Sequence, residues 1–172
     1  MRSRVISVDS DARLIAAFEA SASDLLVYLE RRVSLDDAPD LLGETMVVAW
    51  RRVRDLPDDP ERARMWLFGI ARGTLQNHAR GQKRRWVLAD RIRFQIRDDA
   101  TAPPADAGSE VRDAIARLDP DLAELVRLIH WDGFSITDAA ELLGIPASTA
   151  RGRYQRAKEL LRAALSIEAP LA

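Results

Sequence analysis

Residues 135–162 constrain the fold more than any other stretch of the chain. Ser135 is a good N-cap, and the apolar residues that follow it recur at helical spacing. Gly144 stands where a left-handed residue would end that helix, and Pro146 stands where a second helix can begin. From Ala147 the pattern is helical again. The stretch therefore predicts two short helices joined by a turn that contains glycine.

The second of these helices has one small, apolar side and one basic side. The apolar side consists of Ala150, Tyr154, Ala157 and Leu161. The basic side carries Arg151, Gln155, Lys158 and Arg162, flanked by Arg153 and Arg156. Arginine suits guanine edges and phosphates, and glutamine can pair with adenine. The pattern is typical of a DNA-binding helix-turn-helix, and an ordinary helical hairpin with a solvated basic face is the alternative.

Basic charge is concentrated in two places, although the formal net charge of the 172 residues is −1. Residues 72–97 hold eight basic side chains and one acidic side chain, whereas residues 98–146 are mainly acidic. The basic helix described above is the second concentration. Two separate contacts with a polyanion are therefore favoured.

Helical periodicity runs through the chain, and no strand-like alternation of any length interrupts it. Residues 98–109 are small, polar and rich in proline, so they predict a flexible linker. We therefore expect an all-α fold with two small helical domains, at residues 9–97 and 110–166.

The front domain is expected to contain four helices. The first lies within residues 9–32, and the small residues 21–23 suggest that it breaks into two pieces. A long helix begins near Glu61, after a loop rich in proline and aspartate. The helix before that loop is expected to face the core with Leu42, Met46, Ala49, Trp50 and Val53.

Catalytic and metal chemistry find no support in the sequence. There is no cysteine, and neither His78 nor His130 has a nucleophile or a metal-ligand pattern around it. No metal, no cofactor and no enzyme activity are therefore predicted. The start is not a secretory signal and no apolar run approaches membrane-spanning length, so we expect a cytoplasmic protein without membrane insertion.

The order of the motifs is more specific than any one of them. DLLGETMVVAWRRV comes first, then a loop rich in proline and aspartate, and then ARMWLFGIARGTLQNHARGQKRR. After the linker the chain reads IARLDPDLAELVRLIHWDGFSITDAAELLGIPASTARGRYQRAKELL. This order resembles the extracytoplasmic-function sigma factors of bacteria, over roughly residues 14–165. The resemblance implies a protein that binds RNA polymerase core and directs promoter-specific transcription initiation.

The resemblance also implies the partners. Region two of such a factor docks on the β′ clamp helices of polymerase, and the matching positions here are Asp40, Leu41, Glu44 and Thr45. The polymerase β flap, promoter DNA and an inhibitory anti-sigma factor are further implied partners. Gly43 stands where the family usually has glutamine.

In the family, the helix with the WLFGIAR motif opens the downstream (minus-ten) promoter element and holds a flipped base in a pocket. The resemblance assigns this contact to Arg64, Trp66, Arg72, Gly73, Asn77, Arg80, Lys83, Arg84 and Arg85. The loop at residues 56–63 would shape the pocket. Gly73 stands where the family usually has asparagine.

The helix-turn-helix resembles the family's region four, which reads the upstream (minus-thirty-five) element in the major groove. The implied contacts are Thr149, Arg151, Gly152, Arg153, Gln155, Arg156 and Lys158. Arg151, Gln155 and Arg156 are the expected readers of bases and phosphates, whereas Thr149 and Arg153 are expected to touch the DNA backbone. Gly152 stands in for the family's usual serine.

A regulator that binds DNA without polymerase, through its C-terminal helix-turn-helix, is the alternative function. That reading leaves the DLLGET and WLFGIAR motifs of the front domain unexplained.

Overall fold

The computed structural model describes residues 2–92 and 109–167, and the side chains of residues 9–82 and 110–165. Every regular element in these ranges is a helix, so the all-α prediction is confirmed for them.

The chain divides into two compact units, Met1–Arg97 and Asp98–Ala172. The segment predicted as a linker, residues 98–109, lies outside the described residues except for its last position, where a helix begins. The domain bounds at 9–97 and 110–166 and the flexibility of the linker stay predictions.

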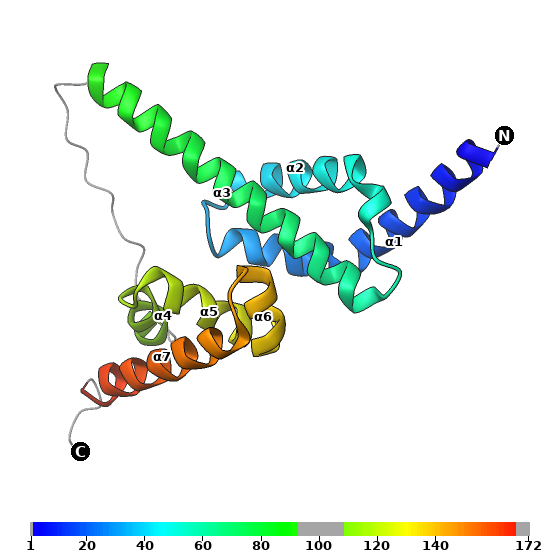
Figure 1. Cartoon of the computed structure of the whole chain (residues 1–172). Helices are drawn as coiled ribbons and strands as arrows, with labels where there is room; N and C mark the ends of the chain where they lie inside the picture. The colour runs from blue at the N-terminus through cyan, green and yellow to red at the C-terminus, as the bar shows by residue number, and fades with distance from the viewer. Residues whose placement is uncertain (1, 93–108, 168–172) are drawn as a thin grey trace. The chain divides into compact units, whose positions relative to one another are not determined.

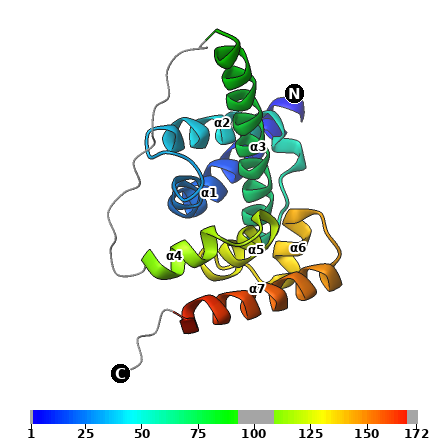
Figure 2. The same ribbon diagram turned by 90° about the vertical axis from the view of Figure 1, so that its left-hand side faces the viewer.

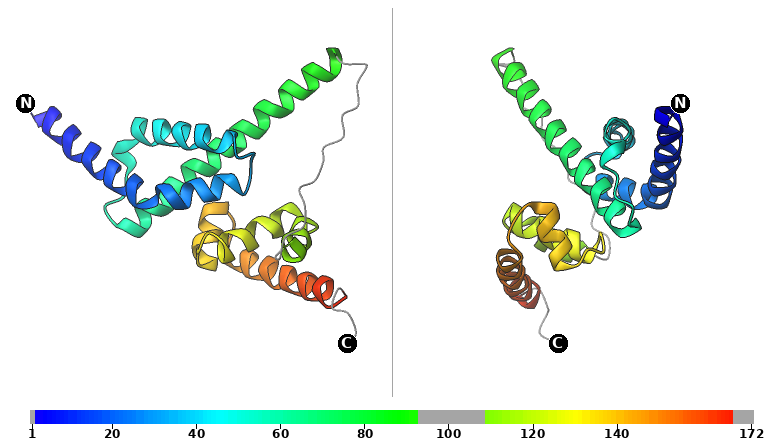
Figure 3. Two further views of the ribbon diagram at one scale, coloured as in Figure 1. Left: turned by 180° about the vertical axis from the view of Figure 1, so that it is seen from behind. Right: turned by 45° about the vertical axis from the view of Figure 1, so that its right-hand side comes forward.

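The first unit is built from α1 (Arg2–Glu30), α2 (Asp37–Arg51) and α3 (Pro60–Ile92). A single 3-10 turn, η1 (Val53–Asp55), follows α2. Each of the three α-helices packs against the other two (Figure 1). Figure 3 shows from two further sides that the N-terminal end of α1 extends beyond α2.

Large apolar side chains from α1 and α3 form the centre of this unit. Leu14, Leu25 and Leu29 of α1 are fully buried, as are Leu67 and Phe68 of α3. The Phe68 ring meets the buried Tyr28 ring edge to face, with centroids 5.1 Å apart and planes at 72°. This arrangement suits the opposite charges of ring face and ring edge.

The predicted break in the first helix is wrong. Within the described residues α1 runs through residues 21–23 without interruption, so the first unit has three α-helices there instead of four. Ser21 is almost fully buried. Serine is only a moderately poor helix former, and the packing of α1 on two other helices outweighs its local preference.

The second unit contains α4 (Ser109–Ala116), α5 (Pro120–His130), α6 (Ile136–Leu143) and α7 (Ala147–Ile167). Figure 2 shows α7 running beside the other three helices, and it packs against each of them. A core cluster joins α4, α5 and α7 through Ile115, Ala123, Val126 and Ala157. The second unit therefore holds α7 firmly on one side.

The beginning of α5 confirms a local prediction. Asp119 is the N-cap, its side chain accepts a hydrogen bond from the Asp121 N–H at 3.0 Å, and Pro120 takes the first helical position. The helix ends at His130, and Gly133 then takes a positive φ of 73° in the turn to α6.

Candidate nucleic-acid and partner-binding surfaces

The turn between α6 and α7 has the geometry that the sequence predicted. Ser135 Oγ accepts a hydrogen bond from the Asp138 N–H at 3.2 Å, so it caps α6. Gly144 has a φ of 68°, and its N–H donates to the Glu141 carbonyl at 3.0 Å. α7 begins directly after Pro146. These local features fix the angle at which α7 leaves the turn.

The two sides of α7 also lie as predicted. Ala150 and Ala157 are fully buried, and Tyr154 and Leu161 are partly buried beside them. The predicted DNA-contact residues that are exposed on α7 are Thr149, Arg151, Gly152, Gln155 and Arg156. At the positions assigned to DNA, α7 therefore presents three long polar side chains, the small side chain of Thr149 and the bare backbone of Gly152 to solvent.

Two of the predicted DNA-contact residues are engaged within the second unit. Arg153 Nη1 lies 2.9 Å from Asp121 Oδ2 at the start of α5. Lys158 places its ammonium 5.0 Å from the centre of the Tyr154 ring. The Tyr154 hydroxyl in turn lies 2.8 Å from His130 Nε2. The contacts of Arg153 and Tyr154 tie α7 to α5, and the contact of Arg153 with the DNA backbone stays a prediction.

Arg156 is the exposed arginine with an acidic neighbour on its own helix. Its Nη1 lies 3.7 Å from Glu159 Oε2, and both side chains are more than half exposed. An exposed pair at this separation contributes little free energy, so the guanidinium can leave it for a DNA contact.

On α3 the predicted contacts whose side chains are described are either exposed or partly exposed. Asn77 and Arg80 are exposed, and Arg72 and Gly73 are partly exposed. The Arg80 Nε–H donates to the Gln76 carbonyl at 3.2 Å, on the same exposed side. The side chains of Lys83, Arg84 and Arg85 lie outside the described residues, although α3 continues through them.

Arg64 and Trp66 do not fit the predicted contact with DNA. Arg64 pairs with Asp24 of α1 at 3.2 Å, and its guanidinium carbon lies 4.7 Å from the centre of the Phe68 ring. The Trp66 Nε1 is buried, and no described residue accepts its hydrogen. Both side chains are partly buried, and Arg64 is held against α1 by its contact with Asp24.

The loop before α3 is shorter than the sequence indicated. The helix begins at Pro60, so only residues 56–59 of the predicted 56–63 loop lie outside helices. Leu56 is buried at one end. At the other end, Asp59 Oδ1 accepts the Arg62 N–H at 2.9 Å, which caps α3. The two residues between these ends, Pro57 and Asp58, are held by a contact from α1: Arg13 Nη2 donates to the Pro57 carbonyl at 3.1 Å and lies 2.6 Å from Asp58 Oδ1.

The buried stripe of α2 is not the one that the sequence predicted. Ala38, Leu41, Thr45 and Ala49 are buried. Trp50, predicted in the core, is 44% exposed, and Leu42 and Met46 are only partly buried. The Thr45 hydroxyl donates to the Leu41 carbonyl at 2.7 Å, so this polar side chain needs no outside partner.

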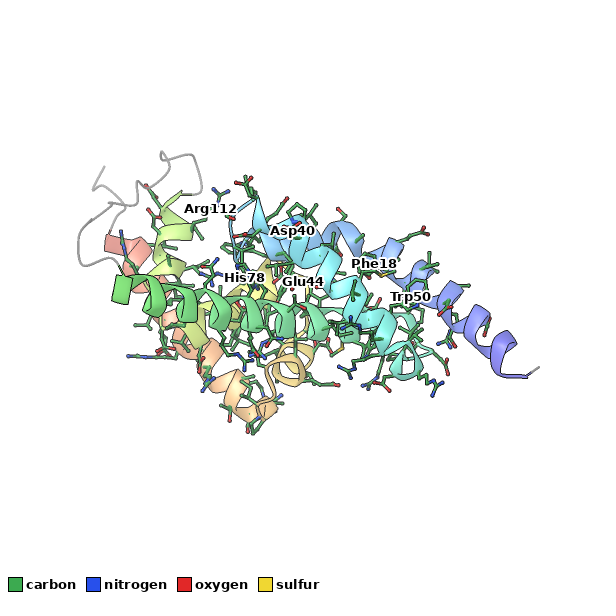
Figure 4. All side chains as sticks on the ribbon, turned by 90° about the horizontal axis from the view of Figure 1, so that it is seen from above. Phe18, Asp40, Glu44, Trp50, His78 and Arg112 are labelled. Carbon is green, nitrogen blue, oxygen red and sulfur yellow. The ribbon has the colours of Figure 1, made fainter. Side chains whose placement is uncertain are left out.

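Two predicted partner-binding residues are therefore core residues. Leu41 is 2% exposed and Thr45 is 0% exposed, so neither can meet another protein across the surface of this fold. The exposed side of α2, which we call the α2 surface, consists of Asp40, Gly43, Glu44, Val47 and Trp50. Figure 4 shows Asp40, Glu44 and Trp50 following one another along this helix. The sequence prediction named neither Val47 nor Trp50 for this side of α2, although the helical spacing of Asp40, Glu44 and Val47 places Val47 there.

The described part of the chain holds no cluster of side chains that resembles a metal site. No three His, Cys, Asp or Glu side chains gather there in a way that could hold an ion. His78 Nε2 lies 2.8 Å from Gln82 Nε2 and 3.8 Å from Asp37 Oδ2, so it joins α3 to the start of α2. None of the helices within residues 2–92 and 109–167 is long and apolar enough to cross a membrane.

Comparison with known protein families matches both units. Residues 18–85 match the family model described as Sigma-70 region 2, and residues 109–161 match the model described as Sigma-70, region 4. The region 2 match contains the α2 surface and the exposed part of α3, and the region 4 match contains the helix-turn-helix.

Individual relatives match most of the chain. The ECF RNA polymerase sigma factor SigC of Mycobacterium tuberculosis is 31% identical over 158 residues, which are 89% of this chain and 84% of that protein. The ECF RNA polymerase sigma-E factor of Haemophilus influenzae is 29% identical over 161 residues, 86% of this chain and 83% of that protein. The sigma factor RpoE of Bartonella quintana, solved in complex with the anti-sigma factor NepR, matches with 27% identity and a TM-score of 0.65, covering 93% of this chain and 98% of that one. The chain therefore belongs to the extracytoplasmic-function family of RNA polymerase sigma factors.

Proposed function

We propose that the two units divide promoter recognition, with the α7 side chains reading the upstream element and α3 with the loop before it opening the downstream element. As a member of its family, the chain associates with RNA polymerase and directs promoter-specific initiation. One observation carries the proposal: the chain joins a region 2 unit and a region 4 unit, and each presents basic or polar side chains from one exposed helix side.

For the upstream element, we assign base and phosphate contacts to Arg151, Gln155 and Arg156. They are exposed on the helix that follows the Gly144 turn, which is the position of the recognition helix in this motif. Thr149 and Lys158 lie on the same helix and suit contacts with the DNA backbone. Gly152 leaves room for the DNA backbone to approach α7, because nothing lies within 4 Å of the position that a Cβ would take there.

For the downstream element, we assign the melted strand to the exposed side of α3. Asn77 and Arg80 are exposed there, and Arg72 and Gly73 lie before them on the same helix. Lys83, Arg84 and Arg85 extend the basic character along the same helix and are included on sequence grounds. Residues 56–59 supply the irregular backbone that a pocket for an unstacked base requires.

For polymerase, we assign the α2 surface. Its two carboxylates, Asp40 and Glu44, suit the steering and register of a protein partner, and Val47 and Trp50 supply apolar area. Tryptophan is among the residues that most often dominate the free energy of an interface. The β′ clamp helices are the part of polymerase that we place on this surface, with the β flap left to the second unit.

Three further assignments follow from family membership. Sigma factors are non-catalytic regulators, and we propose that this chain likewise has no enzyme activity and needs no cofactor. We place it in the cytoplasm with polymerase. RpoE was solved in complex with the anti-sigma factor NepR, and we propose that an anti-sigma factor binds this chain too.

Reconstitution with bacterial RNA polymerase core tests the proposal. Core plus this chain should produce transcripts from a subset of genomic fragments, and core alone should not. The absence of any promoter-dependent transcript would contradict the proposed function. Sequence-specific gel shifts by the chain alone, unchanged by core, would support the polymerase-independent regulator instead, which the region 2 match disfavours.

A further inference from the structure

Arg13 of α1 contacts the two central residues of the loop before α3, Pro57 and Asp58. Its Nη2 donates to the Pro57 carbonyl at 3.1 Å and lies 2.6 Å from Asp58 Oδ1. The Arg13 side chain is 37% exposed, whereas that of Asp58 is 95% exposed. One partly buried cation thus holds both the backbone and the side chain of a loop that otherwise projects into solvent.

The two ends of this loop are fixed by other means. The Leu56 side chain is buried and its N–H donates to the Val53 carbonyl at 3.2 Å. Asp59 caps α3 through the Arg62 N–H, and its carbonyl accepts the Ala63 N–H at 2.8 Å. Pro57 has no N–H, so its carbonyl is the only backbone hydrogen-bonding group with which it can be held. The contact from Arg13 therefore acts on the part of the loop that neither end controls.

We propose that Arg13 is a positioning residue for base discrimination: it sets the backbone at Pro57 and Asp58, and thereby the shape of the pocket that receives the unstacked base of the downstream element. This inference rests on the proposed role of residues 56–59. Arg13 itself need not touch DNA, because it acts through the loop. A pocket wall that moves accepts several bases, whereas a fixed wall favours the base that fits it.

The contact suits positioning better than stability. An exposed ion pair adds little to the free energy of unfolding. Arginine can nevertheless direct two N–H groups of one planar head at a carbonyl and a carboxylate together. Removing it should leave the helices of the first unit intact and release only the loop.

Promoter discrimination by the reconstituted holoenzyme tests this role. A promoter selected by the wild-type holoenzyme from a randomised library is changed to each other base, one position at a time, in the downstream and upstream elements. Transcript yields are compared for wild type, Arg13→Ala, Arg13→Lys and Asp58→Asn. Asp55→Asn is the matched control, because the Asp55 carboxylate pairs with Arg52 at 3.2 Å, whereas Arg13 pairs with Asp58.

Arg13→Ala should lower the preference for the selected base about fivefold at one downstream position, the factor that an ordinary hydrogen bond is worth. Asp58→Asn should lower it in the same direction, and Arg13→Lys should restore part of it. Discrimination in the upstream element and the affinity for polymerase core should not change. Asp55→Asn should behave as wild type.

Two results would overturn the role of Arg13 alone: unchanged downstream discrimination in Arg13→Ala, or an equal loss of yield on every promoter. Because the Asp58 side chain is exposed, Asp58→Asn should fold even if Arg13→Ala does not. It then tests whether the contact between Arg13 and Asp58 affects downstream discrimination. A wild-type holoenzyme that initiates without regard to the downstream element would overturn the proposed role of the loop as well. The failure of the further inference and that of the proposed function are therefore distinguishable.

Discussion

Asp121 and Arg153 join the first turn of α5 to the helix that carries the DNA-contact residues. Arg153 Nη1 lies 2.9 Å from Asp121 Oδ2, and the two side chains are 36% and 65% exposed. A second contact between the same helices joins His130, the last residue of α5, to the hydroxyl of Tyr154, the residue directly after Arg153 on α7. The position of α7 is therefore set by polar contacts on one edge as well as by its buried alanines.

Replacing Arg153 should weaken upstream recognition less than replacing Arg151. Arg153 is held by Asp121, so Arg153→Ala should cost less than about 1 kcal/mol in the free energy of unfolding and a similar amount in promoter binding. Arg151→Ala removes an exposed side chain from the DNA side and should cost about 1–3 kcal/mol if the contact is bidentate. Transcript yield as a function of holoenzyme concentration measures the loss of promoter binding in each of the two variants. Urea unfolding measures the change in the free energy of unfolding.

The neighbouring carboxylate supplies the control for this comparison. Asp121→Asn removes the charge that holds Arg153 and leaves Arg151 unaffected. If Arg153→Ala proved as damaging as Arg151→Ala while Asp121→Asn had no effect, Arg153 would be a DNA contact after all.

Arg156 should distinguish a base contact from a phosphate contact. If its guanidinium pairs with a guanine edge, Arg156→Ala should relax discrimination at one upstream base pair by about 1–3 kcal/mol and leave the other positions unchanged. Holoenzyme binding to upstream elements with single-base changes measures this. Glu159→Gln is the control, because it removes the 3.7 Å partner and should leave discrimination intact. An equal loss on all sequences would assign Arg156 to phosphate.

Trp50 should contribute most of the apolar binding energy of the α2 surface. It is 44% exposed, so Trp50→Ala should change the free energy of unfolding by less than about 1 kcal/mol. Affinity for polymerase core should fall by about 2 kcal/mol or more if Trp50 is an interface hot spot. Fluorescence anisotropy of the labelled chain, titrated with core, measures the affinity.

Replacing Leu41, on the same helix as Trp50, should reduce stability and leave the affinity for polymerase core unchanged. Leu41→Ala opens a cavity in the core and should cost about 2–5 kcal/mol in the free energy of unfolding. The fraction that stays folded should bind core with unchanged affinity. Unchanged affinity in Trp50→Ala would remove Trp50 from the polymerase interface.

Features encoded within a few residues could be predicted from the sequence. The Ser135 cap, the left-handed Gly144 and the Pro146 start of α7 each depend on the preferences of one residue and its nearest neighbours. The basic side of α7 followed from helical spacing alone, because its opposite side is marked clearly by small apolar residues.

The side of α2 that is buried could not be predicted in the same way. Both sides carry apolar residues, so spacing permits more than one orientation. Packing against α1 and α3 decides between them, and the internal hydrogen bond of Thr45 makes its burial inexpensive. The contact of Arg13 with Pro57 spans 44 positions of sequence, and nothing local signals it.

Gly152 and Gly144 should respond in opposite ways to alanine. Gly152 lies inside α7 with a helical backbone and open space around a Cβ, so Gly152→Ala should raise the free energy of unfolding by about 0.5–1 kcal/mol. Gly144 has a φ of 68°, where a Cβ strains the backbone, so Gly144→Ala should lower it by about 1–2 kcal/mol. Urea unfolding of the full chain, followed by circular dichroism, measures both. A destabilised Gly152→Ala would mean that this glycine relieves a strain in α7 that its open surroundings do not show, whereas a stabilised variant with normal upstream binding would show that the DNA side tolerates a methyl group there.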